Sequence, residues 1–311
     1  MKRLKTINKY LPVLISLIVV AGIVIGLVRS SNNQPLGQTG PIRIVAAENF
    51  WGSLASQLGG TKVKVVSIVS DPNADPHEYE VDNTDARDIA TANYVIINGA
   101  GYDSWSNKLL AASPKPNRKV LDVASLLGKK TGDNPHFWYS PDYVNRVVKQ
   151  MEQNLMAIDP TDKTYFVDQY NNLTASLSGY QNRIATIKRQ FVGTKVAATE
   201  DIFAYLASAA GLNLISPASF TEAVAEGNDP PTGSVVQFQQ QLQNGQVKVL
   251  VYNEQTVTPL TTSMKLVAAE QNIAVVGVTE TIQPPDTSFQ VWMNAELLNL
   301  QNALNAQALG N

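Results

Sequence analysis

The two histidines of this chain stand in near-copies of one short motif. They occur in residues 75–79 (DPHEY) and 134–138 (NPHFW), as His77 and His136. With 16 prolines in 311 residues, a proline ahead of both histidines has a chance probability of roughly 1 in 400. Asp and Asn side chains hydrogen-bond the backbone two residues on, and proline fixes φ, so each imidazole is presented from a stiff turn. This repeated pair indicates metal ligands rather than isolated core or surface histidines.

Two imidazoles make half of a metal site, and carboxylates in the second half of the chain are candidates for the rest. Glu200 directly follows a predicted strand, and Glu280 comes just after another. Both therefore occupy the carboxyl ends of predicted strands. Together with His77 and His136 they form the predicted ligand set. Glu254 is an alternative to Glu280 as the fourth ligand. The remaining nearby acids are interpreted as outer or surface groups: Glu78, Glu80, Asp201 and Asp286.

A single long helix is predicted between these two halves. From residue 163 to residue 191 the apolar residues recur at alternating steps of four and three, which keeps one helix face apolar throughout. At about 1.5 Å per residue, this helix reaches roughly 43 Å. Gly193 follows the last periodic position and ends it. Because similar patterns lie on both sides, we expect the helix to connect two lobes.

Short apolar strands alternate with helices in both halves, which predicts an α/β fold with two parallel sheets covered by helices. The strands are expected at residues 42–46, 62–69, 94–97, 119–123, 195–199, 212–216, 248–252 and 274–278. The helices are expected at residues 50–58, 82–92, 102–112, 141–158, 202–210, 234–243, 261–271 and 289–308. Ligands of such sheets bind beyond the carboxyl ends of the strands, so the cleft between the lobes is the expected site.

The first 28 residues are expected to belong to neither lobe. Residues 1–10 carry four basic residues and no acid, and residues 11–28 form an uncharged apolar run of 18 residues. Such a run covers roughly 27 Å, close to the thickness of a bilayer. A cleaved signal peptide is one interpretation. We favour a retained transmembrane anchor or uncleaved signal, because no small-residue cleavage pattern follows the apolar run.

The predicted domain organisation follows directly from these patterns. It comprises residues 1–28 as anchor, 29–41 as linker, 42–160 as N-terminal lobe, 161–192 as connecting helix and 193–311 as C-terminal lobe. The positive flank of the anchor stays in the cytoplasm, so the lobes should face the outside of the cell.

Charge and cysteine content narrow the function classes. Beyond Arg29, 19 basic residues face 26 acidic ones, a net charge of −7. An acidic exterior domain without a basic cluster is a poor nucleic-acid binder, so no nucleic-acid partner is expected. The chain contains no cysteine, which excludes disulfides, thiolate metal sites and a lipid-modified cysteine.

Residues 42–308 resemble the metal-binding solute receptors of ABC transporters, a family of zinc and manganese receptors that includes streptococcal-type lipoprotein adhesins. The resemblance rests on five features of the sequence, which together are specific. They are residues 75–80 (DPHEYE), residues 94–99 (YVIING) continuing to Trp105, residues 134–138 (NPHFW), residues 199–205 (TEDIFAY) followed by Gly211-Leu212, and the proline-bearing turn before Ser234.

The resemblance implies two lobes bridged by a rigid helix, with one metal ion held by two residues from each lobe. Carried over, the ligands are His77 and His136 from the first lobe, and Glu200 and Glu280 from the second. Three features depart from the family pattern. The lipid-attachment cysteine is absent, so anchoring falls to residues 11–28. No histidine-rich loop separates the two histidine motifs. Glu200 stands where zinc-specific members commonly have histidine.

The implied function is an extracellular receptor, monomeric and not an enzyme, that delivers a divalent ion to an ABC permease and uses no organic cofactor. Carboxylate ligands favour Mn²⁺, with Zn²⁺ close behind and iron a minor candidate. Two rival functions are a surface adhesin with a structural metal and an extracellular metallohydrolase. The sequence shows no His-Glu-x-x-His motif or nucleophile elbow, which disfavours the hydrolase.

Overall fold

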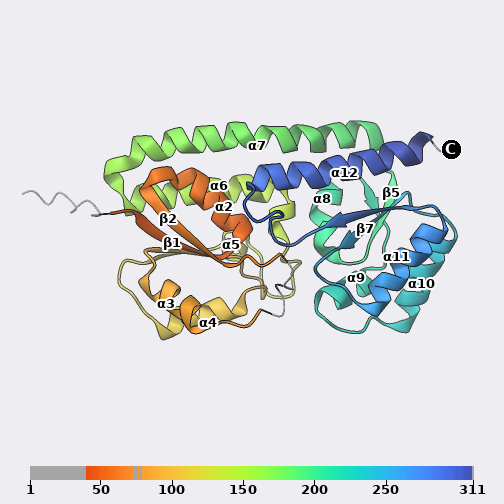
Figure 1. Ribbon diagram of the computed structural model, residues 1–311, viewed down its shortest axis with the longest axis horizontal. Helices are drawn as coiled ribbons and strands as arrows, with labels where there is room; N and C mark the ends of the chain where they lie inside the picture. The colour runs from red at the N-terminus through yellow and green to blue at the C-terminus, as the bar shows by residue number, and fades with distance from the viewer. Residues whose placement is uncertain (1–39, 73–75, 77–78, 310–311) are drawn as a thin grey trace, which may run out of the picture. The chain divides into compact units, whose positions relative to one another are not determined.

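The computed structural model describes residues 40–72, 76 and 79–309, which fall within one compact unit that begins at Gly40. This unit contains two four-stranded parallel sheets with helices packed against them (Figure 1). The predicted α/β class with two parallel sheets is confirmed. None of the helices in the described ranges is long and apolar enough to cross a membrane. The anchor predicted for residues 11–28 lies outside the described residues, as do His77 and Glu78.

The first sheet and its helices precede the long helix α7 (Lys163–Phe191). Its strands run in the order β2-β1-β3-β4. The elements in chain order are β1 (Ile42–Glu48), α2 (Asn49–Gly59), β2 (Val63–Val69), α3 (Asn83–Thr91), β3 (Tyr94–Ile97), α4 (Ser104–Ala112), β4 (Lys119–Asp122), α5 (Val123–Leu127) and α6 (Pro141–Ile158).

The second sheet follows α7 and repeats the same strand order, β6-β5-β7-β8. Its elements are β5 (Lys195–Ala198), α8 (Ala204–Ala209), β6 (Asn213–Leu214), α9 (Ala218–Ala225), α10 (Thr232–Gln243), β7 (Val249–Asn253), α11 (Pro259–Glu270), β8 (Ala274–Val278) and α12 (Phe289–Leu309). Short 3₁₀ turns occur at Gly60–Lys62, Phe137–Tyr139, Pro160–Asp162 and Asp201–Phe203. The predicted division into lobes at residues 160 and 193 stays a prediction.

Helix α7 has the ends that the sequence predicted. A 3₁₀ turn at Pro160–Asp162 leads into it, and Gly193 follows it in the left-handed region with φ of 76°. The backbone N–H of Gly193 donates to the carbonyl of Gly211 at 2.8 Å, which turns the chain into β5. The apolar face of α7 packs against α2, α6 and α12, and α12 runs beside it in Figure 1.

One hydrophobic core continues through both sheets and α7. It includes Ile44 on β1, Leu54 on α2, Leu177 on α7, Val278 on β8 and Leu297 on α12, all at most 1% exposed except Val278 at 3%. Moving the two sheets far apart would expose this shared apolar cluster to water, so it would cost a large free energy. The two halves are therefore joined by packing as well as by the chain.

The predicted strands and helices have ends within two residues of those in the structure, and three of the differences are informative. The strand predicted at 119–123 ends at Asp122, because the Asp122 side chain accepts from Ser125 N (2.9 Å) and starts α5. The strand predicted at 212–216 shrinks to the edge strand β6, and beyond it the Ser216 side chain bonds to the backbone N–H (2.7 Å) and carbonyl (3.0 Å) of Ala198 on β5. The helix predicted at 202–210 begins as a 3₁₀ turn and is helical only over α8. Helices α5 and α9 were not predicted.

Candidate metal centre

His136 is presented by the turn that its motif predicted. The Asn134 side-chain oxygen accepts from the backbone N–H of His136 at 2.9 Å, across Pro135. The following residues form a 3₁₀ turn, and the imidazole is fully buried. An Asx turn with proline at its centre fixes the direction in which the side chain leaves the backbone. The stiff presentation of this imidazole is therefore confirmed.

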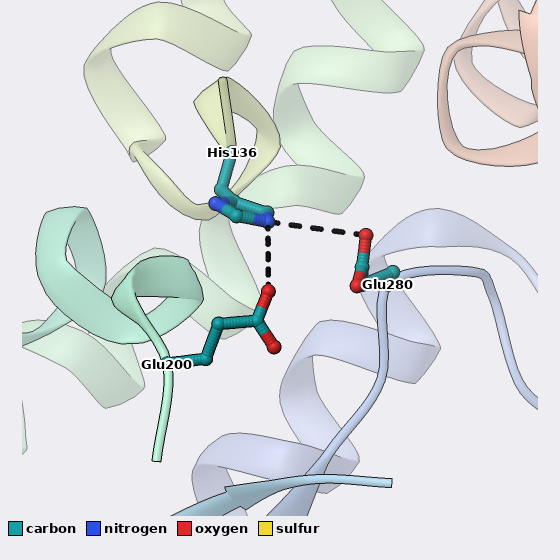
Figure 2. Close-up of side chains that lie close together, drawn as sticks. All are labelled: His136, Glu200 and Glu280. Atoms are coloured by element: carbon teal, nitrogen blue, oxygen red, sulfur yellow. Dashed lines mark ion pairs between the residues drawn. The ribbon is translucent and has the colours of Figure 1, made fainter. Parts of the chain in front are cut away.

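The two ring nitrogens of His136 face different partners. Nδ1 lies 2.9 Å from Asn134 Oδ1 and 3.1 Å from Asp201 Oδ1. Two acceptor oxygens place the ring proton on Nδ1, which leaves the Nε2 lone pair directed away from them. Nε2 lies 3.8 Å from both Glu200 Oε1 and Glu280 Oε2, and Figure 2 marks these two pairs with dashed lines. The ring is thus oriented as a metal-ligating histidine would be.

The charge around His136 changes its proton affinity. Burial alone would lower the pKa of its imidazole, but the hydrogen bond and charge of Asp201, with the charges of Glu280 and Glu200, raise that pKa overall. The site is therefore strongly attractive to positive charge, whether carried by a proton or by a metal ion.

Glu200 and Glu280 converge because their strands are parallel and close in the sheet. Glu200 follows β5 and Glu280 follows β8, and β7 lies between these two strands. The carboxyl ends of parallel strands meet at one edge of a sheet. Both carboxylates are fully buried. Two acids and two histidines were expected to meet here; the structure brings both acids towards His136, and His77 lies outside the described residues.

Asn253, the last residue of β7, bridges the two carboxylates. Its Nδ2 donates to Glu200 Oε2 at 2.5 Å and to Glu280 Oε1 at 2.9 Å. Its Oδ1 accepts from the backbone N–H of Gln255 at 3.0 Å, which fixes the orientation of the amide group. Asn253 was missed from the sequence, although it follows the same rule as the two glutamates, a polar side chain at the carboxyl end of a buried strand.

Further hydrogen bonds orient Glu280. Tyr102 Oη donates to Glu280 Oε2 at 2.6 Å. The side-chain oxygen of Gln255 accepts from the backbone N–H groups of Glu280 (2.7 Å) and Thr281 (2.9 Å). Burial and the neighbouring Glu280 charge hold the pKa of Tyr102 well above its usual range, so its hydroxyl keeps its proton and acts as a donor. Neither Tyr102 nor Gln255 carried a sequence signal for this role.

The loop beyond Glu280 is fastened to the first half of the chain. The backbone N–H of Ile282 donates to Asn49 Oδ1 at 3.0 Å, and Gln283 Nε2 donates to the carbonyl of Pro72 at 2.7 Å. Farther on, Phe289 N donates to Ser53 Oγ at 3.1 Å. Glu280 is thus held from both sides of the site.

The spacing of the ligand atoms suits a single ion. One ligand atom each from His136, Glu200 and Glu280 lies within 4.8 Å of the others, and all three residues are buried. Metal–ligand bonds of about 2.1 Å at tetrahedral angles place ligand atoms roughly 3.4 Å apart. The 3.8 Å separations from Nε2 need only a small adjustment to reach that value. One nitrogen and two oxygens are donors that first-row transition metals accept.

Three other candidate acids within the described ranges, Glu254, Glu80 and Asp286, are not part of this group. Glu254 is exposed, and its carboxylate lies against Gly277, where a Cβ would stand. Glu80 and Asp286 are also exposed. Asp201, predicted to be an outer or surface group, lies against Nδ1 of His136.

The sequence matches the family model described as zinc-uptake complex component A, periplasmic (ZnuA), over residues 44–303. The chain belongs to this family. Curated relatives include the metal ABC transporter substrate-binding lipoprotein FimA of Streptococcus parasanguinis, 24% identical over 202 residues, 60% of this chain and 65% of FimA. A metal ABC transporter substrate-binding lipoprotein of Lactococcus lactis is 28% identical over 55% of this chain and 59% of its own length. The manganese ABC transporter substrate-binding lipoprotein PsaA of Streptococcus pneumoniae is 25% identical over 66% and 70%.

Solved structures share the fold of this family member. A Pseudomonas aeruginosa protein, the SBP FpvC in complex with Mn²⁺, superposes with a TM-score of 0.71 at 19% identity, covering 86% of this chain and 99% of FpvC. A crystal structure of ZnuA gives a TM-score of 0.66 at 21% identity, covering 84% and 98%. The sequence alignments cover less of the relatives than the structural superpositions do: this chain spans 65% of FimA and 59% of the Lactococcus protein.

Proposed function

We propose that this protein is an extracytoplasmic receptor that binds one divalent transition-metal ion and delivers it to an ABC permease. The ligands would be His77, His136, Glu200 and Glu280. The observation that carries the proposal is that His136, which precedes α7 in the sequence, and Glu200 and Glu280, which follow it, bring their ligand atoms together in one buried cluster. The names of relatives such as PsaA, a manganese ABC transporter substrate-binding lipoprotein, support it.

The donor set favours transport over catalysis. Four protein ligands fill a tetrahedral site, whereas a catalytic zinc keeps an open position for water or substrate. We therefore propose that the ion is cargo and that the protein, acting as a monomer, is not an enzyme. The two carboxylates favour Mn²⁺ by their hardness, and Zn²⁺ is the close second because it outbinds Mn²⁺ at most nitrogen and oxygen sites.

The anchor is the second part of the proposal. Several relatives are named lipoproteins, but this chain contains no cysteine to carry a lipid. We propose that residues 11–28 hold the protein at the cell membrane, with the binding site on the outer side. Protease accessibility on intact cells tests this orientation: cleavage of the lobes by external protease is expected, and protection until lysis would refute it.

Metal analysis tests the receptor function. The purified full-length protein, freed of metal with a chelator and then dialysed against Mn²⁺ or Zn²⁺, should retain one equivalent by mass spectrometry. His136→Ala should abolish retention, because it removes a buried ligand. The Glu254→Gln variant, in which an exposed acid is changed, should retain one equivalent of metal. Retention of a full equivalent by both His136→Ala and His77→Ala would refute the proposed site.

A further inference from the structure

Each carboxylate of the site uses its two oxygens differently. Glu200 Oε1 and Glu280 Oε2 face His136 Nε2 at 3.8 Å. The opposite oxygens, Glu200 Oε2 and Glu280 Oε1, both accept from the one amide nitrogen of Asn253. One oxygen of each pair is therefore directed towards the ion position, and the other is held away from it.

The amide of Asn253 is itself fixed. It is 1% exposed, and its backbone N–H donates to Thr199 Oγ1 at 3.4 Å. Because Asn253 Oδ1 accepts from the backbone N–H of Gln255, a flipped amide would place two donors in contact and bring Oδ1 against two carboxylates. The side chain therefore presents Nδ2 to the glutamates. Thr256 Oγ1 adds a second, longer bond to Glu280 Oε1 at 3.3 Å.

This arrangement opposes bidentate binding. A carboxylate that turns both oxygens towards an ion would have to pull its second oxygen away from Asn253 Nδ2. If both glutamates did so, the buried Asn253 N–H₂ group would lose two charged acceptors and keep only Thr256 Oγ1 at 3.1 Å, which is unfavourable for a group that is 1% exposed. Monodentate carboxylates limit the contribution of Glu200 and Glu280 to two metal–oxygen bonds.

Ligand number distinguishes the two candidate ions. Zn²⁺ is satisfied by four ligands in a tetrahedron. Mn²⁺ belongs with the hard ions that take oxygen-rich, six-coordinate surroundings, for which bidentate carboxylates supply additional bonds. A residue that keeps both carboxylates monodentate therefore raises the preference for Zn²⁺ relative to Mn²⁺.

We propose that Asn253 is a specificity-determining residue that limits Glu200 and Glu280 to one metal bond each and so shifts the metal preference towards Zn²⁺. The proposal rests on the proposed receptor function. Asn253 itself is a positioning residue: it holds the ligands and does not contact the ion.

The test compares the wild type with Asn253→Leu, which removes the amide donors while keeping a similar volume. Dissociation constants for Mn²⁺ and Zn²⁺ are measured by competition with a metal-sensitive chelator. The ratio of the Zn²⁺ to the Mn²⁺ affinity should fall about tenfold in Asn253→Leu, the lower end of the effects seen when groups behind metal ligands are removed. Asn154→Leu is the matched control, because Asn154 is a buried amide that donates to Tyr94 Oη, away from the metal centre.

X-ray absorption provides a readout that a purely structural role would not change. The wild-type protein should show about four nitrogen and oxygen ligands to Zn²⁺ with monodentate carboxylates. The Mn²⁺ complex of Asn253→Leu should gain at least one oxygen ligand over that of the wild type. Bidentate glutamates in the wild-type Zn²⁺ complex would overturn the proposal, even if the variant does not fold.

The remaining outcomes separate the two proposals. If the wild type binds one equivalent of metal and Asn253→Leu weakens both ions by the same factor, only the role of Asn253 is overturned. If the wild type retains neither Mn²⁺ nor Zn²⁺, the receptor function is overturned and this inference falls with it. A tenfold fall in the ratio of Zn²⁺ to Mn²⁺ affinity in Asn253→Leu, without such a fall in Asn154→Leu, supports the role of Asn253.

Discussion

Removing one carboxylate charge from the metal centre should affect the metal-free and metal-bound protein in opposite directions. Glu200 and Glu280 are fully buried, and their ligand oxygens lie within 4.8 Å of each other. At an effective dielectric constant of about 20, two unit charges at that distance repel by roughly 3–4 kcal/mol. At a pH above the raised pKa of His136 the imidazole is neutral, so Glu200→Gln or Glu280→Gln removes this repulsion without losing an attraction to a charged ring, and it keeps the side-chain volume. After losses from imperfect hydrogen bonds, we expect the metal-free protein to gain about 1–2 kcal/mol.

The same substitutions should remove most of the stabilisation that metal binding gives. At a free metal concentration of 1,000 times Kd, binding stabilises the native state by about 4 kcal/mol. For a domain of this size that raises Tm by roughly 8 °C or more. We therefore expect a large metal-dependent rise in the wild type. In either glutamine variant, the metal-free Tm should be higher than that of the wild type, and the increase in Tm on adding metal should be small.

Thermal unfolding followed by circular dichroism, with chelator and with added Zn²⁺ or Mn²⁺, measures both effects. Glu254→Gln is the matched control, since this exposed acid follows Asn253 directly and packs against Gly277. It should leave both Tm values unchanged. A full metal-dependent rise in Glu280→Gln, with loss of that rise in Glu254→Gln, would show that Glu254 is the fourth ligand and refute the placement described here.

Three further predictions concern protonation and ligand orientation. Metal affinity should fall as pH falls through the raised pKa of His136, above the ordinary 6.5, because only the neutral imidazole binds metal; an affinity unchanged from pH 8 to pH 5 in competition titrations would contradict this. Asp201→Asn should weaken metal binding about tenfold, because Nδ1 of His136 loses a charged acceptor; the exposed Glu80→Gln is the control, and equal Kd values for the two variants would argue against that role. Burial raises the pKa of Glu296 from 4.5 to about 8, so the native state holds a proton that the unfolded state releases, and the free energy of unfolding should fall as pH rises between these values, by up to about 5 kcal/mol. Glu296→Gln should flatten that part of a denaturant-measured pH profile, and superimposable profiles would refute it.

The fold was predictable where one pattern dominated. Strand Tyr94–Ile97 and helices Pro141–Ile158 and Lys163–Phe191 have the predicted ends, because an apolar run or a 3.6-residue period was bounded by clear polar or proline signals. The prediction was less accurate where local bonds compete with the pattern. At Asp122 a side-chain cap ends a strand that the apolar sequence would have continued.

Of the four predicted ligands, the structure brings three together, and the sequence did not predict the side chains that orient them. His136, Glu200 and Glu280 could be found because each sits at a turn or strand end with the chemistry of a ligand. Tyr102 and Asn253 join them from elements separated in sequence by 178 and 27 residues from Glu280. The bond from Tyr102 follows from the packing of elements, which no single-sequence period encodes, whereas Asn253 stands at the end of a buried strand and could have been found by the rule that found the glutamates.

The shared core constrains how an ion could leave the site. Ile44, Leu177 and Leu297 belong to one buried cluster that joins both sheets through α7 and α12. A wide hinge opening would expose that cluster, at about 25 cal/mol for each Å² of apolar surface. Breaking individual hydrogen bonds, such as the 2.7 Å bond from Gln283 to Pro72, costs only about 1 kcal/mol each. On these magnitudes, we expect release to proceed through displacement of the loop that carries Glu280, with the two sheets still packed together.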